Sequence, residues 1–511
     1  MKCFSSMRLV ISLVRRSFSI GGFFFFFLFS FDVKAQNEIN IQHAESLEGM
    51  ETPEGSLKRL TGNVVLQQNN VTLLCDNADL YDATNKLIAN GHVKIIQDTV
   101  TISSDHLVYD GNTRKAVLTG NVKLTDTKIV LKTSQLDYDL NTKIGYYHTG
   151  ATVTNDSSVL TSNRGFYHAN NGDIDFKDNV KITDPKYFLT ADSLRFNVDS
   201  KTSYFLAPTN IKTDSGNIYC EGGYYDTKND LALFTKHARV NNPPQILTAD
   251  SILYNMKNKN GEGFGHIRWA DTTEKIILLG NYAKYNENTK SIYATKHPVL
   301  INVIENDSMF MTADKLFSEV DSATDYRSFH AYHHVKIFKS DMSAVCDSLA
   351  FSYEDSTFRF FHNPVLWVDK NQLKADTINM LMSKNKIDKI DLRHSSIIVS
   401  EADTSKFNQI QGKNMVGSFR DGKMNKLDVT GNGESIYYAE ADSTNMLGVN
   451  KAICSNMIIY IDSNKVDRII FLTKPEATLY PVSQAPADEI KLKNFVWLFA
   501  LKPKTKEDIL N

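Results

Sequence analysis

A strand-like phrase that returns about every 29 residues constrains the fold of this chain more than any other feature. Residues 60–66 read LTGNVVL, and the phrase comes back as GHVKI at residues 91–95 and as LTGNVKL at residues 118–124. Later copies stand at residues 178–182, 265–269 and 333–337. A fixed period of roughly 20–50 residues indicates a repeat architecture, in which one unit cannot bury its apolar face without stacked neighbours. Function is therefore expected from the long surface of the stack and not from a single pocket.

A second phrase alternates with the first and reads small-Asp-x-Leu-x-aromatic. It occurs at residues 104–109, 191–196, 249–254 and 346–351. Asn- and Gly-rich turns, such as those at residues 110–112 and 170–172, separate the phrases and are typical of hairpins. Each repeat therefore predicts two antiparallel strands, and the chain is predicted to be an elongated all-β stack of about thirteen repeats.

Alternation of apolar and polar residues selects the face of each strand that points into the stack. In the first phrase a lysine or arginine separates the two apolar residues, so that the base points outward. Val299 and Ile301 belong to the inward set by this rule. The residues predicted to line an apolar interior groove are Val64, Leu66, Val93, Ile95, Leu107, Tyr109, Val122, Leu124, Leu136, Tyr138, Val180, Ile182, Leu194, Phe196, Ile252, Tyr254, Ile267, Trp269, Val335, Ile337, Leu349, Phe351, Val365 and Trp367.

The N-terminus has the composition of a targeting segment. A basic lead precedes an apolar run at residues 18–31, which is long enough for a signal sequence but short of the roughly 20 residues that span a bilayer. Residues 1–35 are predicted to be a cleaved signal peptide, with an uncleaved anchor as the alternative. In either case the body of the protein is expected to be exported.

The rest of the chain divides by the regularity of the repeats. Residues 36–56 are predicted to be an N-terminal edge segment, residues 57–270 regular repeats and residues 271–471 less regular repeats. Residues 472–511 contain prolines and an apolar run, and they predict either a cap over the last repeat or a docking tail.

Several columns of the repeat could suggest other chemistry. Cys75, Cys220, Cys346 and Cys454 share the column of Ala191, and strands at about 4.8 Å spacing place them too far apart for disulfides, so buried free thiols are expected. One Asp per repeat is too sparse for calcium and suits turns instead. The histidines near residue 333 occupy corner positions that hold Asn elsewhere, so no metal site is predicted.

Composition and motifs exclude other classes of function. The formal net charge is −2, and no basic block would attract nucleic acid. The chain contains no G-x-x-x-x-G-K-[ST] phosphate loop, no G-x-S-x-G and no H-E-x-x-H. We therefore expect no enzymatic activity, no cofactor and no nucleic-acid partner.

The tandem order of LTGNVxL and TADxLxY resembles the OstA/LptA-like lipopolysaccharide transport family, most clearly at residues 57–254 and still at residues up to 471. The resemblance implies an open, V-shaped β-jelly-roll, also called a β-taco, in the periplasm or associated with the outer membrane. It implies that the groove shields lipopolysaccharide acyl chains, and that edge strands pair with OstA-like components at the inner and outer membranes. The tail resembles that of long OstA-like proteins from Bacteroidetes-type bacteria.

Physical chemistry supports the same role. Exposing an acyl chain of a dozen methylenes to water costs roughly 10 kcal/mol, which an apolar groove would largely remove. The alternative is an exported structural β-solenoid or adhesin-like protein with a closed core and no lipid cargo. The volume left between the two walls of the stack distinguishes these hypotheses.

Overall fold

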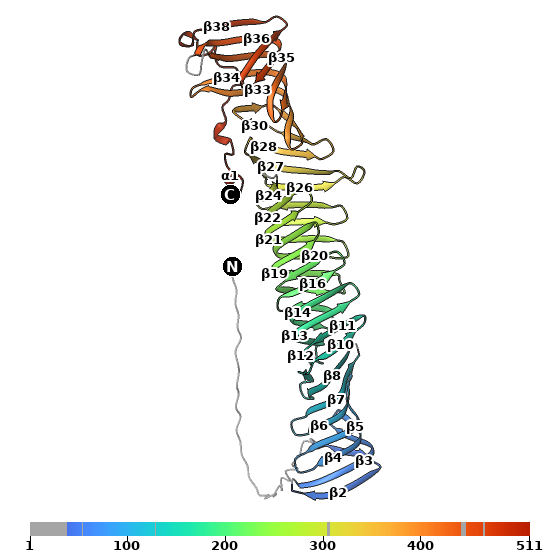
Figure 1. Cartoon of the computed structure of the whole chain (residues 1–511). Helices are drawn as coiled ribbons and strands as arrows, with labels where there is room; N and C mark the ends of the chain where they lie inside the picture. Colours follow the sequence, from blue (N-terminus) through green and yellow to red (C-terminus); the bar gives the residue numbers. More distant parts are fainter. Residues whose placement is uncertain are drawn as a thin grey trace, which may run out of the picture.

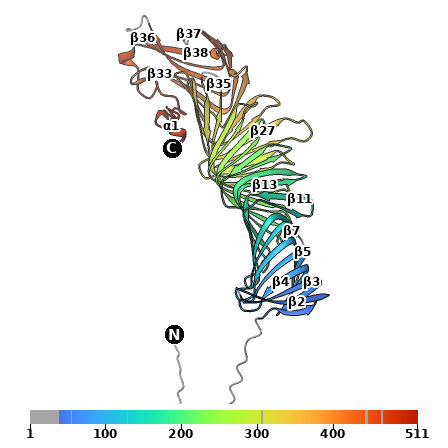
Figure 2. The ribbon, with the colours of Figure 1, turned by 60° about the horizontal axis from the view of Figure 1, so that its bottom comes forward.

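A long, curved stack of antiparallel strands forms almost the entire molecule (Figures 1 and 2). The computed structural model describes residues 38–53, 55–127, 129–303, 307–440, 446–462 and 465–510. The predicted signal peptide lies outside the described residues. Within them no helix is both long and apolar enough to cross a bilayer.

The N-terminal part of the stack, blue to blue-green in Figure 1, consists of β1 (Asn40–His43), β2 (Ser46–Thr52), β3 (Gly55–Gln68), β4 (Val71–Tyr81), β5 (Lys86–Gln97), β6 (Val100–Asp110), β7 (Lys115–Asp126), β8 (Ile129–Asp139), β9 (Ile144–Tyr147), β10 (Ala151–Asn155), β11 (Ser158–Ser162), β12 (Arg164–His168), β13 (Asp173–Asp184) and β14 (Tyr187–Asn197). The middle part consists of β15 (Thr202–Phe205), β16 (Thr209–Thr213), β17 (Asn217–Cys220), β18 (Gly222–Asp226), β19 (Leu231–Asn242), β20 (Gln245–Asn255), β21 (Asn260–Asp271), β22 (Ile276–Asn286), β23 (Ser291–Thr295), β24 (Val299–Asn302), β25 (Met309–Thr312), β26 (Lys315–Val320), β27 (Arg327–Lys339) and β28 (Met342–Ser352). The C-terminal part consists of β29 (Thr357–Phe361), β30 (Val365–Val368), β31 (Asn371–Lys374), β32 (Thr377–Ser383), β33 (Lys386–Asp403), β34 (Lys406–Arg420), β35 (Lys423–Glu440), β36 (Met446–Asp462), β37 (Lys465–Leu472) and β38 (Glu476–Tyr480).

Each pass of the chain across the stack bends at a corner. In β3 the corner is Gly62 and Asn63, whose φ angles are +79° and +46°, and the pairing with β4 shifts between Thr61 and Val64. Eighteen strands cross the corner without a break, and the other twenty form ten passes of two short strands each, so the described residues make 28 passes. This equals fourteen two-pass repeats, close to the thirteen expected.

The corner divides every pass between two walls. The first wall contains the part of β3 before Gly62, and the second wall contains the part after Asn63. The chain reverses at the outer rim of each wall, where the turns of the first wall use Asx geometry. Asp110 Oδ1, for example, accepts hydrogen bonds from the backbone N–H groups of Asn112 and Thr113, both at 3.0 Å. The two walls thus form a V in cross-section, with the corners at its base and the rims at its mouth.

The inward side chains form one apolar cluster that runs along the stack from Ile39 to Ile459. The bases between them are exposed on the outer face, as the alternation predicted: Lys94, Lys123, Lys181, Arg268 and Lys336. The four described cysteines are buried free thiols, which confirms the prediction. Burial raises the pKa of Cys75 and Cys220 to about 12.

The C-terminal tail does not cover the open end of the stack, as a cap would. β38 completes the last pass by pairing with β36, and the chain then turns back along the outer face of the second wall. The tail contains η1 (Val482–Gln484), η2 (Phe499–Leu501) and α1 (Glu507–Leu510). α1 contacts β25 and β27, and Figure 1 shows the C-terminus beside the middle of the stack and far from β38.

Candidate functional site

The structure places 22 of the 24 predicted groove residues on the inward faces of the two walls. Nineteen of these side chains are at most 7% exposed. Tyr254, Trp269 and Phe351 are half-buried. Alternation of apolar and polar residues therefore predicted the inward faces.

Val365 and Trp367 are the exceptions, and here the prediction is wrong. The corner of this pass is His362 and Asn363, so the first inward position after the corner is Pro364, and Leu366 and Val368 follow it into the interior cluster. Val365 and Trp367 point to the outer face and are buried beneath the C-terminal tail, as the hydrogen bond between Gln372, the strand neighbour of Trp367, and Val496 indicates.

The same difference from the prediction occurs two repeats earlier, in β24. The corner there is Lys296 and His297, followed by Pro298, so that Leu300 enters the interior cluster and Val299 and Ile301 do not. The corner sets the inward face in each of these passes: Pro298 and Pro364 hold the first inward position that Val64 holds in β3, and the prediction gave this position to Val299 and Val365, one residue too late. Side-chain period in a strand is two, and a shift of one residue exchanges the faces.

The mouth of the V is closed in the N-terminal part of the stack. Tyr109 on the first wall donates its hydroxyl hydrogen bond to Gln68 Oε1 on the second wall, and Gln68 Nε2 donates to the backbone oxygen of Gly111 at 2.8 Å. One repeat later Gln97 Nε2 donates to the backbone oxygen of Leu140 at 2.9 Å. Burial raises the pKa of Tyr109, so its hydroxyl stays a donor at neutral pH.

Charged side chains at the turns also join the two rims. Lys143 Nζ lies 2.6 Å from Asp98 Oδ2, and Lys201 Nζ lies 2.6 Å from Asp156 Oδ2. Tyr167 hydrogen-bonds Asp126 in the same way that Tyr109 reaches Gln68. Such hydrogen bonds and ion pairs span the mouth from residue 39 to residue 201. We refer to these contacts as the rim bridges.

The residues on the second wall that make the rim bridges are absent from the predicted set, although a regular spacing in the sequence marks several of them. A polar side chain stands directly before each rim turn of the second wall at intervals of 29 residues: Gln68, Gln97, Asp126, Asn155 and Asp184. Gln68 and Gln97 are almost completely buried. A polar residue at regular intervals in an otherwise apolar pattern is informative, because a buried polar group requires a partner.

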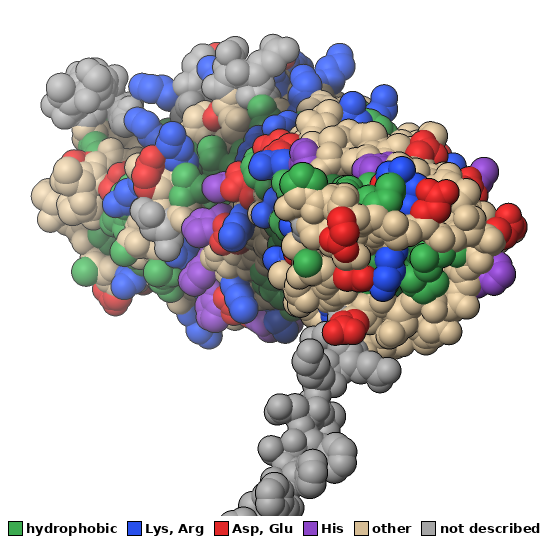
Figure 3. All heavy atoms as spheres, turned by 90° about the horizontal axis from the view of Figure 1, so that it is seen from below, with side chains coloured by type: hydrophobic (Ala, Val, Ile, Leu, Met, Phe, Trp, Pro, Cys, Tyr) green, Lys and Arg blue, Asp and Glu red, His purple; other side chains and the backbone are tan. Residues whose placement is uncertain are grey.

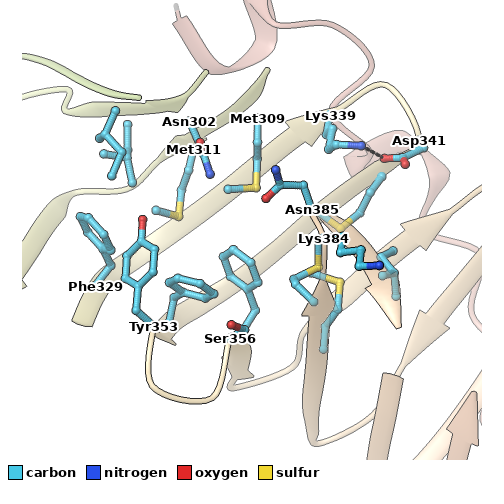
Figure 4. Close-up of a pocket in the computed structure, with 18 residues that line it drawn as sticks. Asn302, Met309, Met311, Phe329, Lys339, Asp341, Tyr353, Ser356, Lys384 and Asn385 are labelled. Atoms are coloured by element: carbon cyan, nitrogen blue, oxygen red, sulfur yellow. Dashed lines mark hydrogen bonds and ion pairs between the residues drawn. The ribbon is translucent and has the colours of Figure 1, made fainter. Parts of the chain in front are cut away.

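An apolar chamber opens between the walls further along the stack, with a cavity volume of about 320 Å³. Figure 4 shows Met309 and Met311 pointing into the same space as Phe329 and Tyr353. Its apolar lining consists of Ile276, Leu300, Met309, Met311, Phe329, Met342, Phe351, Tyr353, Phe358, Met380, Met382 and Ile387. Five methionines surround the space, and their flexible side chains adapt to irregular apolar ligands.

The polar edge of the chamber is built around Lys339. Its Nζ lies 2.9 Å from Asp307 and 2.7 Å from Asp341, and its side chain is 12% exposed. Burial alone would lower the pKa of Lys339, but the two carboxylates outweigh it and raise the pKa. The pKa of Asp307 would be raised by burial, yet hydrogen bonds from Lys339 and Ser340 hold it below its usual value. A charged cluster thus stands next to the methionines.

A wider polar hollow of about 640 Å³ continues the chamber outward. The two spaces share six lining residues: Asn302, Lys339, Asp341, Tyr353, Lys384 and Asn385. The outer hollow adds charged residues of both signs, among them Lys275, Asp369 and Lys423. An apolar interior that opens into a charged vestibule suits an amphipathic ligand with a hydrocarbon part and a polar part.

The sequence also contained a signal for the chamber. Met309 and Met311 belong to one Met-x-Met motif, and Met380 and Met382 belong to another. In a strand, residues two apart share a face, so each motif places two thioethers on the same side. Neither motif fits the two repeated phrases, so the repeat pattern does not mark these methionines as lining residues.

A family model described as "OstA-like protein" matches residues 36–192 and 201–314, which is more than half of the chain. No curated protein matches the chain. The match includes the closed N-terminal part of the stack and the first strands of the chamber, whereas Phe351, Met380 and Met382 lie beyond it.

Proposed function

The chain belongs to the OstA-like protein family, and from that membership we propose that it is a periplasmic lipid-binding bridge. In this proposal it shields the acyl chains of lipopolysaccharide during transport to the outer membrane and assembly there. The protein performs no covalent chemistry in this role. It lowers the cost of moving hydrocarbon through water by offering apolar surface along the stack.

The observation that carries the proposal is the methionine-lined chamber. Its volume lies in the range of lipid- and drug-sized ligand sites, and its lining is apolar except at the edge. Acyl chains would lie against Met311, Phe351 and Met382, while the polar part of the lipid would face the vestibule around Lys339. Methionine side chains accommodate chains of different length without a fixed shape.

In this proposal the closed N-terminal part of the stack is also a path for lipid, and its mouth opens locally, one repeat at a time. The inward residues from Val64 to Phe196 would contact acyl chains only where the rim bridges of one repeat have separated. Most of these bridges are single hydrogen bonds or exposed ion pairs, each worth about 1 kcal/mol or less, so local separation is less costly than unfolding. Lipid would then pass along similar neighbouring sites.

Both ends of the stack offer edges for partners. β38 pairs only with β36, and β2 pairs only with β3, among the described residues. We propose that other OstA-like components, at the inner and the outer membrane, add strands to these edges. The 28 passes at about 4.8 Å span about 130 Å, so that in this proposal one molecule covers much of the distance between the inner and the outer membrane.

Photocrosslinking in living cells tests the function. A photoreactive residue at Met382 inside the chamber is expected to form adducts with lipopolysaccharide, whereas one at Lys123 on the outer face is the matched control and is expected to form none. A photoreactive residue at Tyr109 reports on the closed part, where we expect weaker labelling. Labelling at Lys123 as strong as that at Met382 would argue against an interior path.

The closed interior between residues 39 and 201 favours a second candidate, a structural rod without cargo. A filled core and bridged rims are typical of a structural β-solenoid that binds no cargo. The same crosslinking experiment separates the two functions. Absence of lipid adducts from Met382 and Phe351, in a protein that folds and is exported normally, would leave the rod as the better account.

A further inference from the structure

The C-terminal tail is held on the outer face of the second wall by three polar side chains. Gln409 donates to the backbone oxygen of Ile490 at 3.1 Å and accepts from the backbone N–H of Leu492 at 2.9 Å. Gln372 makes the same pair of bonds with Val496 and Leu498, both at 2.7 Å. These bonds fix the tail as an extended strap on a rigid sheet.

Ser343 provides the third attachment, since its hydroxyl donates to the backbone oxygen of Pro503 at 2.7 Å. The side of the strap that faces the sheet is apolar and buried: Leu492 is 4% exposed and Ile509 is 3% exposed. Leu492 packs with Ile436, Tyr438 and Val449 in an apolar cluster separate from the interior of the stack. The strap is therefore part of the folded structure.

The other side of the strap exposes large apolar side chains to solvent. Val496 and Phe499 are 42% and 41% exposed, and Leu501 is 56% exposed. Trp497 stacks on Phe499 with ring centroids 5.8 Å apart and contacts Phe407 of β34 at 5.0 Å. The aromatic rings thus form a continuous row that the sheet supports from below.

Lysines lie on both sides of this row, and the acidic residues nearest in the sequence, Asp488, Glu489, Glu507 and Asp508, stand directly beyond them. Residues 490–506 contain five lysines and no Asp or Glu: Lys491, Lys493, Lys502, Lys504 and Lys506. Lys491 lies over the ring of Phe495 at 5.4 Å, and Lys502 and Lys504 lie over Phe499 at 5.6 and 5.1 Å. Elsewhere charges of both signs are intermingled, as the face in Figure 3 illustrates. We name Val496, Phe499, Leu501 and the four lysines Lys491, Lys493, Lys502 and Lys504 the tail patch.

We propose that the tail patch docks on the surface of an anionic lipid bilayer. Exposed aromatic and aliphatic side chains next to lysines are the composition of interfacial membrane anchors, in which apolar groups enter the head-group region and lysines meet lipid phosphates. Of the adjacent carboxylates, Glu489 pairs with Lys451 and Glu507 lies 4.0 Å from Lys506, so the charge beside the exposed rings is that of the lysines and favours an anionic surface. This contact is independent of the proposed cargo and would orient the C-terminal half of the stack along a membrane.

Vesicle flotation of the mature chain, residues 36–511, tests the docking. We expect binding to phosphatidylcholine vesicles that contain phosphatidylglycerol, little binding to phosphatidylcholine alone, and weaker binding as salt is raised. Each of the substitutions Lys491→Gln, Lys493→Gln, Lys502→Gln and Lys504→Gln is expected to lower the partition coefficient about five-fold. Phe499→Ser and Leu501→Ser are expected to lower it by about ten-fold each.

The matched control removes four exposed lysines from the sheet, with Lys94→Gln, Lys123→Gln, Lys132→Gln and Lys181→Gln, and is expected to bind as the unaltered chain does. Equal loss in this control, or full binding by a chain that carries all four lysine substitutions of the tail patch, would overturn the proposal, as would an absence of binding to anionic vesicles. Met382→Trp separates docking from uptake of cargo. If that variant alone abolished vesicle binding, the contact would run through the chamber and the tail patch would have no role.

Discussion

Lys143 Nζ lies 2.6 Å from Asp98 Oδ2, and this ion pair joins the two rims of the stack across its mouth. The two residues are 45 positions apart, which is about one and a half repeats. Gln68 and Gly111, which are 43 positions apart, show the same offset. The walls are therefore staggered, so that each repeat of the second wall closes against the first wall of later repeats.

The buried amide of Gln68 is expected to stabilise the closed mouth. Gln68→Ala removes two hydrogen bonds and leaves Tyr109 and the backbone oxygen of Gly111 without these partners. We expect local stability to fall by about 2–4 kcal/mol, measured as amide hydrogen exchange in β3 to β7. Gln67→Ala, at the neighbouring exposed position, should change it by less than about 0.5 kcal/mol. Equal protection in both variants would show that the rim bridge contributes nothing.

The corner glycines are expected to tolerate no side chain. Gly120 has a φ of +77°, and a Cβ there would lie 2.6 Å from Asp105 Oδ2. Gly120→Ala is therefore expected to lower the unfolding midpoint in urea, with a cost of about 1–3 kcal/mol. Gly49 in β2 has no heavy atom within 4 Å of the corresponding position, so Gly49→Ala serves as control and should be nearly neutral. A neutral Gly120→Ala would mean that the corner is not constrained.

Filling the chamber should block an apolar ligand without unfolding the protein. Met382→Trp places a larger side chain in a cavity of about 320 Å³, and we expect at least a ten-fold loss of affinity for a fluorescent fatty-acyl probe. Thermal stability should change little, because the space is already present. Met50→Trp in β2, outside the chamber, is the control and should bind the probe normally. Unchanged binding by Met382→Trp would place the ligand elsewhere.

The charged edge of the chamber should respond to acid. Because the pKa of Asp307 in the folded protein is below its usual value, its contribution to stability is present at neutral pH and is lost as the pH falls through that lowered value, below about 4. Lys339→Met should raise the pKa of Asp307, which carboxyl titration by NMR would measure. Lys336→Met, on the exposed outer face, should leave the pKa of Asp307 unchanged. An identical Asp307 titration in both variants would contradict the arrangement.

Much of the fold could be predicted because it depends on local patterns. The corner pair Gly62 and Asn63, the outward position of Lys94 and the buried thiol of Cys75 all follow from residue type and alternation. The prediction failed at Val365 and Trp367, because Pro364 holds the first inward position after the corner and the predicted set was therefore one residue out of register.

The sequence by itself determined the repeat length, the two passes per repeat and the face that each side chain occupies, because these depend on interactions within one pass or between adjacent passes. Only the tertiary structure decided where the mouth is closed, since that depends on the twist and angle that the walls accumulate over many strands. Tyr109 and Tyr167 carry hydroxyls that reach the opposite rim, whereas Phe351 and Met380 in the same column carry none. The walls stay apart there, and the chamber occupies the space between them.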